Sequence, residues 1–177
     1  MLRFFLARVC PEGGLLVGCV PEVRVRGEKE FEHRFGGLGG DRNGASQDFE
    51  KVLVDELVPY IDSHFRTKAQ KKFRAMAGLS MGGMETHSIT LARPETFGHY
   101  GLLSGGVYTP EEIKDKNQVD YIFLSCGSKE GPDRIKAAAD ALKAAGFNAE
   151  GYISEGTAHE FLTWRRSLYQ MAQKLFK

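Results

Sequence analysis

Cysteine, long apolar runs and an excess of one charge are all scarce in this sequence of 177 residues. Its three cysteines, Cys10, Cys19 and Cys126, are odd in number and too sparse for a disulfide framework, so we expect buried or unreactive thiols. The formal net charge of +1 does not by itself predict binding to nucleic acid or to an anionic membrane surface. The longest apolar runs are too short to span a bilayer. These absences argue against disulfide scaffolds, membrane-spanning proteins and nucleic-acid binders.

A leader segment and a cofactor motif are not recognisable either. The first twenty residues, MLRFFLARVCPEGGLLVGCV, are apolar with an early arginine, but Arg8, Pro11 and Glu12 interrupt them, which makes a poor signal peptide. The compartment therefore stays open: secreted if the native N-terminus has been trimmed, otherwise cytoplasmic. The glycine-rich turns lack a P-loop lysine and the G-x-G-x-x-G spacing, and no residue cluster has metal-ligand spacing. We expect neither a metal nor a cofactor.

Regular alternation of strand and helix patterns begins near residue 45. Strands are expected at 72–79, 99–105, 119–127 and 147–154, and helices at 84–95 and 133–146, the last capped by Asp133 and stopped by Gly146. A further helix, with Ser46 or Asp48 as its cap and kinked or interrupted by Pro59, has one apolar face: Phe49, Val52, Leu53, Leu57, Ile61 and Phe65. A closing helix places another apolar set on one face: Phe161, Trp164, Leu168, Met171 and Leu175.

This alternation predicts one α/β domain over residues 1–177, with a mainly parallel sheet in a three-layer arrangement. Residues 1–45 form an atypical N-terminal segment that is rich in glycine and arginine, and residues 46–177 form the regular core of the domain. In parallel sheets, functional groups gather at the carboxyl ends of the strands. Candidate site residues are therefore sought in the loops that follow the expected strands.

The sequence Gly78-Leu79-Ser80-Met81-Gly82 matches the pattern G-x-S-x-G between an expected strand and an expected helix. Such a strand–turn–helix setting places a serine on a strained turn with its hydroxyl exposed, which is the arrangement of a nucleophile. The backbone N–H of Met81, at the start of a helix, would then face the same point and can stabilise an oxyanion. The alternative is a flexible glycine-rich turn with an incidental serine.

A serine nucleophile needs a base and an acid that orients the base. His159 follows the last expected strand, whereas His33, His64, His87 and His99 come too early or lie within elements, so His159 is the candidate base. Glu130 and Asp133 both follow the strand at 119–127. We favour Glu130, because it lies in the loop itself and Asp133 already serves as a helix cap.

Three segments, RAMAGLSMGG, CGSKEGP and GTAHEFLTWRRSLYQMAQKLF, resemble the esterase D and feruloyl esterase family of α/β-hydrolases (carbohydrate esterase family one). The resemblance runs from about Asp48 to Lys177 and is strongest with bacterial members that remove feruloyl or acetyl groups from plant xylan. It implies the α/β-hydrolase fold, with Ser80 as nucleophile, Glu130 as acid and His159, in H-x-F-x-x-W, as base. The two lines of reasoning thus agree on all three residues.

The first 45 residues depart from this family, which usually has several more strands there and an H-G-x-G loop that supplies a second oxyanion N–H. The segment GGLGGD can replace that loop, with Gly37 or Leu38 as the donor, or can be a plain flexible loop. The front of the sheet is accordingly expected to be shortened or rearranged. The edge strand that this exposes can pair with a second chain, which predicts a homodimer through the N-terminal region.

The resulting hypothesis is a serine esterase without cofactor that acts on a feruloylated or acetylated xylan fragment or another small ester. Alternatives are an acetyl(xylan) esterase, an esterase similar to S-formylglutathione hydrolase, or a truncated and weakly active scaffold. Trp164 either lines the substrate pocket or packs the last helix.

Overall fold

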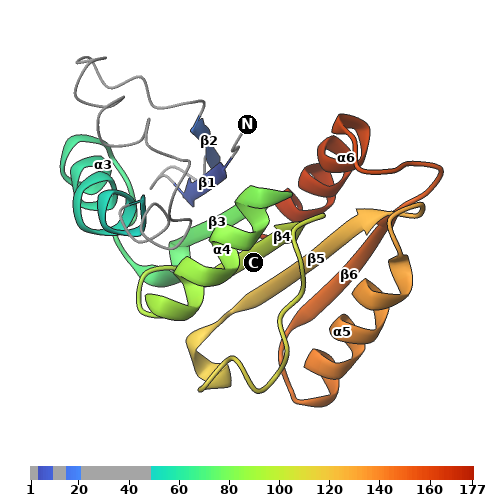
Figure 1. The fold of residues 1–177 in the computed structure, drawn as a ribbon. Helices are drawn as coiled ribbons and strands as arrows, with labels where there is room; N and C mark the ends of the chain where they lie inside the picture. The colour runs from blue at the N-terminus through green and yellow to red at the C-terminus, as the bar shows by residue number, and fades with distance from the viewer. Residues whose placement is uncertain (1–3, 10–14, 21–48) are drawn as a thin grey trace, which may run out of the picture.

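The computed structural model describes residues 4–9, 15–20 and 49–177, and for the first two segments it describes the backbone alone. Figure 1 shows a sheet flanked by helices. Its strands are β1 (Phe4–Val9), β2 (Leu15–Val20), β3 (Arg74–Leu79), β4 (His99–Leu103), β5 (Tyr121–Gly127) and β6 (Ala149–Ser154). The helices are α3 (Val58–His64), α4 (Met81–Ala92), α5 (Pro132–Ala144) and α6 (Phe161–Ala172), with a π-helical stretch η1 (Val52–Leu57) and short 3₁₀ turns η2 (Lys71–Phe73) and η3 (Lys116–Gln118).

The strands follow the order β2-β1-β3-β4-β5-β6 across one sheet. Strands β3 to β6 are parallel to one another, whereas β1 runs antiparallel to both β2 and β3. The predicted α/β fold with a mainly parallel sheet is therefore confirmed. Because the parallel strands are in register, for example Leu79 with Leu103 and Leu103 with Ser125, their carboxyl ends lie along one edge.

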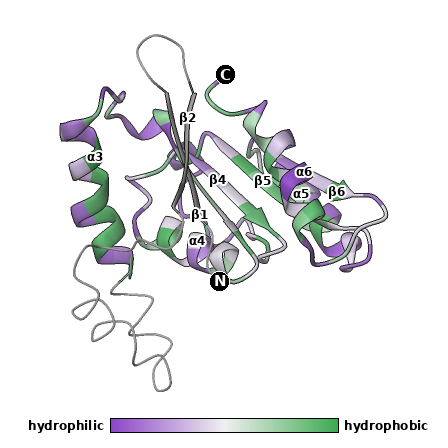
Figure 2. Ribbon diagram, turned by 90° about the horizontal axis from the view of Figure 1, so that it is seen from above, coloured by the Kyte–Doolittle hydropathy of each residue, from purple (hydrophilic) through white to green (hydrophobic). Residues whose placement is uncertain are grey.

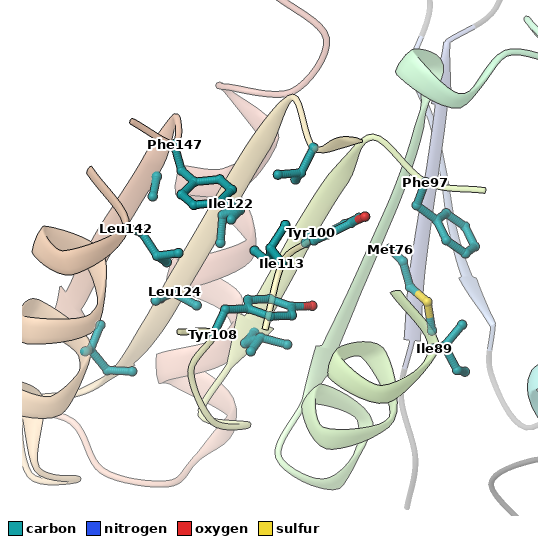
Figure 3. Packing of buried hydrophobic residues seen from close by; sticks show 14 of the residues in the cluster. Met76, Ile89, Phe97, Tyr100, Tyr108, Ile113, Ile122, Leu124, Leu142 and Phe147 are labelled. Atoms are coloured by element: carbon teal, nitrogen blue, oxygen red, sulfur yellow. The ribbon is translucent and has the colours of Figure 1, made fainter. Parts of the chain in front are cut away.

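Helices cover both faces of the sheet and make three layers. Side chains alternate along a strand, so Met76, Leu102 and Leu124 pack in one core, whereas Ala77, Leu103 and Phe123 pack in the other. Helices α4 and α5 lie over the first core, part of which Figure 3 shows, and α6 lies over the second. Every residue of β5 is buried, as expected for a strand covered on both faces, and Figure 2 draws much of it in green.

The helical segment before β3 adjusts to a proline. Pro59 has no N–H for the α-helical bond to the carbonyl of residue 55, and the preceding turns widen to π geometry, in which the Val58 N–H donates to the Leu53 carbonyl. The expected disturbance at Pro59 is thus a widened helix rather than a break. The proposed caps, Ser46 and Asp48, lie outside the described residues.

The predicted elements differ from the structure mainly at their ends. Helix α4 begins three residues earlier than expected, directly after Ser80, and the cap of α5 is Gly131, with φ 83°, rather than Asp133, which lies inside the first turn. Gly146, with φ 90°, follows the end of α5 as predicted. Two residues that were placed on apolar helix faces are not buried: Phe65 is 53% exposed and Phe161 is 60% exposed. Leu175 is buried but lies beyond the end of α6.

The N-terminal part adds two strands that the sequence analysis did not anticipate. Strand β1 pairs with β3 along the whole length from Arg74 to Gly78, and β2 pairs with β1 on its other side. Among the described strands, β3 is therefore not an edge. The predicted homodimer through the N-terminal region stays a prediction.

His99 is the first residue of β4, so it lies at the amino edge of the parallel strands. Its side chain packs beneath the C-terminal segment and is only 5% exposed. The backbone N–H of Phe176 donates to His99 Nε2 over 3.3 Å, which requires the neutral imidazole. Burial lowers the pKa of His99, and the nearby Asp120 carboxylate opposes that shift without cancelling it. His99 is consequently held neutral in the folded protein.

This burial predicts a pH-dependent contribution to stability. As pH falls below about 6.5, the unfolded chain protonates His99 while the folded chain does not, so the free energy of unfolding decreases until the lower folded pKa is reached. His99→Gln should remove that part of the decrease, as measured by urea unfolding at about pH 7.5 and about pH 5.5. The same pH dependence in both proteins would contradict this assignment.

Candidate active site

Polar residues follow each of the four parallel strands at their common carboxyl edge. Ser80 follows β3, Ser104 follows β4, Glu130 lies three residues after β5, and His159 lies five residues after β6. This edge is where parallel α/β sheets carry their functional groups. The register of the sheet therefore brings together side chains that are up to 79 residues apart in sequence.

Ser80 lies on a sharp turn between β3 and α4, where the backbones of the two elements are in close contact. It has φ 51° and ψ −116°, a strained conformation for a residue with a side chain, and its N–H donates to the Leu103 carbonyl over 2.9 Å. A Cβ on Gly78 would lie 1.9 Å from the Gly82 oxygen, and a Cβ on Gly105 would lie 2.4 Å from the Gly83 Cα. The glycines around Ser80 are thus required because α4 starts in direct contact with the ends of β3 and β4.

Three side chains form a continuous line of hydrogen bonds at this edge. The Ser80 Oγ lies 2.8 Å from His159 Nε2, and His159 Nδ1 lies 2.6 Å from Glu130 Oε1. Because the carboxylate only accepts hydrogen bonds, the imidazole proton belongs on Nδ1, which leaves Nε2 to accept from the serine. The residues predicted as nucleophile, base and acid are therefore brought together in that order.

The base and the acid differ in their access to solvent. The side chain of His159 is 49% exposed, whereas that of Glu130 is 13% exposed. An exposed imidazole can be reached by a small molecule or by water. The more sheltered carboxylate is less screened, which strengthens its hydrogen bond to His159.

The loops that carry the acid and the base are bound to each other. The Lys129 N–H donates to the Thr157 carbonyl over 3.0 Å, and the Gly156 N–H donates to the Ser128 hydroxyl over 2.9 Å. A Cβ on Gly127 would lie 2.5 Å from the Thr157 oxygen, so the two loops approach each other as closely as a glycine allows. These contacts set the separation between Glu130 and His159.

The N-terminus of α4 has no side-chain cap. A serine at this position usually accepts a hydrogen bond from the helix backbone, but no capping bond from Ser80 exists, and its hydroxyl bonds His159 instead. The first N–H groups of a helix have no partner within the helix, and those of α4 include Met81. An anion beside Ser80 would meet these donors and the positive end of the helix dipole. The other predicted donors, Gly37 and Leu38, lie outside the described residues.

The structure also distinguishes between Glu130 and Asp133, the two candidates for the acid that orients His159. Within the described part of the chain, the carboxylate that contacts His159 is that of Glu130. Asp133 lies exposed in the first turn of α5, where a negative charge favours the helix N-terminus.

Trp164 and Ser104 complete the surroundings of the acid. The Trp164 indole N–H donates to the Ser104 hydroxyl over 3.1 Å, and its ring meets the His159 ring edge-on at a centroid distance of 5.2 Å. The Ser104 hydroxyl donates in turn to Glu130 Oε2 over 2.9 Å. Sequence reasoning missed Ser104, for which the only signal is its position at the end of an expected strand before two glycines. Trp164 also packs against the second core, and its predicted role in a substrate pocket stays a prediction.

The remaining described histidines have local partners. His64 bonds the Tyr60 carbonyl and Ser63, and His87 pairs with Glu112 over 3.4 Å, while His33 lies outside the described residues. Cys126 is a free, buried thiol whose pKa is raised by burial, which fits the predicted unreactive role; the side chains of Cys10 and Cys19 lie outside the described part.

The described residues contain neither a membrane-spanning helix nor a group of side chains arranged to bind a metal ion. No helix there is long and apolar enough to cross a membrane. No group of three or more His, Cys, Asp or Glu side chains in the same residues is arranged to hold a metal ion.

Comparisons with known proteins agree with this fold. Solved structures with the same fold include a ferulic acid esterase of carbohydrate esterase family one from Anaeromyces mucronatus, in complex with ferulic acid, with a TM-score of 0.60 and 18% identity over 76% of this chain and 56% of that one. Another is the enterochelin esterase from Shigella flexneri, with a TM-score of 0.59 and 22% identity over 92% of this chain and 42% of that one. The chain thus has the α/β-hydrolase fold.

The family follows from the sequence match. A model of the Esterase family matches residues 25–175, and the chain belongs to that family. An endo-1,4-beta-xylanase/feruloyl esterase from Xylanibacter ruminicola is 64% identical over 146 residues, which are 82% of this chain and 20% of that protein. An uncharacterized protein from Bacillus subtilis is 24% identical over 140 residues, 73% of this chain and 54% of that one. The chain spans a fifth to about half of the length of these relatives.

The packing around Ser80 predicts a large effect of one methyl group. Gly78→Ala places a Cβ against the Gly82 carbonyl, so α4 must move, and we expect a loss of about 1–3 kcal/mol in the free energy of unfolding. Labelling of Ser80 by a fluorophosphonate should also slow, because the turn that aims its hydroxyl is lost.

A matched control is Gly131→Ala, whose Cβ would have no atom within 4 Å although φ is 83°. Its cost should be confined to backbone strain of about 1–2 kcal/mol, with labelling of Ser80 unchanged. Normal labelling of the Gly78 variant would show that the close approach is not needed.

Proposed function

We propose that this chain is a serine esterase that hydrolyses carboxylic esters through an acyl-enzyme intermediate. The observation that carries the proposal is the line of hydrogen bonds from Ser80 through His159 to Glu130 at the carboxyl edge of the sheet. A serine hydroxyl is a weak nucleophile unless an adjacent base takes its proton, and His159 Nε2 lies at the right distance to do so. Membership of an esterase family supports the same reaction.

In the first half of the reaction, Ser80 Oγ attacks the ester carbonyl carbon as its proton moves to His159 Nε2. The carbonyl oxygen becomes an oxyanion next to the uncapped start of α4, where the Met81 N–H stabilises it. The intermediate collapses, the bond to the alcohol breaks, and His159 returns the proton to the departing oxygen. The acyl group is then held on Ser80.

In the second half, a water molecule loses a proton to His159 and attacks the acyl carbon, and the carboxylic acid leaves as Ser80 recovers its proton. Glu130 holds the imidazole with Nδ1–H toward the carboxylate in both halves and stabilises the imidazolium by its negative charge. No cofactor is needed, because proton transfers and one covalent intermediate complete the cycle.

We propose feruloyl esters of plant xylan fragments as the substrate class. The support is the 64% identity with a protein described as an endo-1,4-beta-xylanase/feruloyl esterase, because such similarity extends over 82% of this chain. The strands, loops and helices that carry Ser80, Glu130 and His159 all lie within this chain. A small-molecule or oligosaccharide ester is therefore the expected partner.

Replacement of the nucleophile tests the reaction. Ser80→Ala should lower the turnover of methyl ferulate and of p-nitrophenyl acetate by about 10⁶-fold, since the hydroxyl that takes the acyl group is removed. The matched control is Ser63→Ala, which changes an exposed serine on α3 and should leave both rates unchanged. Equal, near-background rates for the wild type and Ser80→Ala would refute the esterase and favour a scaffold.

The two carboxylates give a second test. Glu130→Gln keeps the size of the side chain but removes the charge that orients His159, and kcat should fall by about 10⁴-fold. Asp133→Asn removes a charge from the neighbouring helix turn and should change kcat less than twofold, apart from a small loss of stability (about 0.3–1 kcal/mol). The reverse order of effects on methyl ferulate hydrolysis would assign the acid to Asp133.

A further inference from the structure

The Glu130 carboxylate receives hydrogen bonds on both oxygens. Oε1 faces His159, and Oε2 accepts from the Gly127 N–H over 2.6 Å and from the Ser104 hydroxyl over 2.9 Å. The first of these two donors is part of the backbone of the same loop. Ser104 is different, because it comes from another strand end, 26 residues away in sequence.

The direction of each bond at Ser104 follows from the chemistry of its neighbours. An indole N–H only donates, so the Ser104 oxygen must be the acceptor from Trp164. A carboxylate only accepts, so the Ser104 proton must point to Glu130. The hydroxyl therefore uses both capacities in one orientation, and its rotation is fixed from both sides.

Trp164 couples this arrangement to the base. Its indole N–H holds Ser104, while its ring lies at an interplanar angle of 88° to the His159 ring. The same side chain is anchored in the core on the α6 face of the sheet. One aromatic residue thus contacts the imidazole directly and contacts the carboxylate through one hydroxyl.

The backbone at Ser104 supports a role for its side chain. Ser104 has φ 52°, in the left-handed region that favours glycine, and the next two residues are Gly105 and Gly106. Glycine would fit this conformation at lower cost. A serine at this position gains two hydrogen bonds within the site in exchange for the strain.

We propose that Ser104 is a positioning residue for the proposed esterase reaction: it transmits the fixed orientation of Trp164 to Glu130, so that Oε1 stays aimed at His159 Nδ1. The proposal rests on the proposed function. It assigns to Trp164 a task in orienting the acid and the base. Without the Ser104 hydroxyl, the carboxylate keeps one backbone donor and can rotate, so that His159 loses its alignment with Ser80.

The first experiment compares Ser104→Gly, Ser104→Ala and Ser125→Ala. Both Ser104 variants lack the hydroxyl, but glycine also relieves the left-handed backbone, so loss of activity in Ser104→Gly does not arise from unfolding. We expect kcat for methyl ferulate to fall about 10- to 100-fold in both, with KM within twofold, because only alignment is lost. Ser125→Ala, at a buried serine of the adjacent strand whose hydroxyl has no hydrogen-bond partner among the described residues, should retain wild-type kcat.

A spectroscopic readout separates positioning from a merely structural effect. Trp164 is the only tryptophan, so its indole N–H gives one identifiable proton resonance. In Ser104→Gly this resonance should shift and exchange faster with water, and the low-field proton signal of His159 Nδ1–H should weaken. Unchanged signals for both protons would overturn the proposal.

A double-mutant cycle tests whether the two residues act as one unit. Trp164→Phe keeps an aromatic ring beside His159 but removes the N–H donor. If Trp164 acts through Ser104, the loss of kcat in the double variant with Ser104→Gly should be smaller than the product of the two single losses. Multiplicative losses, a kcat within twofold of the wild type in Ser104→Gly, or a loss confined to KM would each overturn the proposal. Failure of the proposed function itself is distinct, because wild-type turnover of ester would then be absent.

Discussion

The contact between the first turn of α4 and the ends of β3 and β4 is the constraint on which the site depends. Glycine at positions 78, 83 and 105 lets backbone touch backbone there, with no room for a side chain. Because the chain must reverse within one residue, Ser80 adopts a strained conformation and its hydroxyl turns away from the helix that it would ordinarily cap. One packing requirement thus directs the serine hydroxyl toward His159 and leaves the helix N-terminus without a side-chain cap.

The parallel register of the sheet turns this local feature into a site. Four strand ends at one edge supply a serine, a second serine, a carboxylate and a histidine, and the loops after β5 and β6 are hydrogen-bonded to each other. Burial differs across the line: the carboxylate is sheltered and accepts hydrogen bonds on both oxygens, while the imidazole is half-exposed. Electrostatic support therefore lies deep in the site, and the reacting atoms lie at its surface.

Sequence reasoning succeeded where a short pattern and the fold class jointly determine a position. The residues Ser80, Glu130 and His159 were each predicted from their place after a strand, and the structure brings them within hydrogen-bonding distance. The clearest of the four parallel strands was β5, because a strand that is buried on both faces is a continuous apolar run. The predicted ends of the strands differ from the observed ends by up to two residues, because residues at a strand boundary resemble those of the adjoining loop.

Other features depend on contacts that a linear pattern does not contain. Ser104 interacts with partners 26 and 60 residues away in the sequence. A serine before two glycines is as typical of an ordinary turn as of a functional site. The exposure of Phe161 could not be read from helical spacing, because tertiary contacts decide which residues of the first turn of α6 are covered: Thr163 in that turn is buried, whereas Phe161 is not. The strands β1 and β2 lie in a segment with weak periodicity, and the pairing of β1 with β3 is a tertiary property.

The most direct test of this account is to trap the acyl-enzyme. The protein would be mixed with excess 4-nitrophenyl ferulate, quenched with acid within the first turnover, digested, and analysed by peptide mass spectrometry. The account predicts a feruloyl adduct on the Ser80 hydroxyl, formed at the rate of the initial burst of nitrophenol. Steady turnover of the ester with no adduct on Ser80, or with an adduct on a different residue, would contradict it.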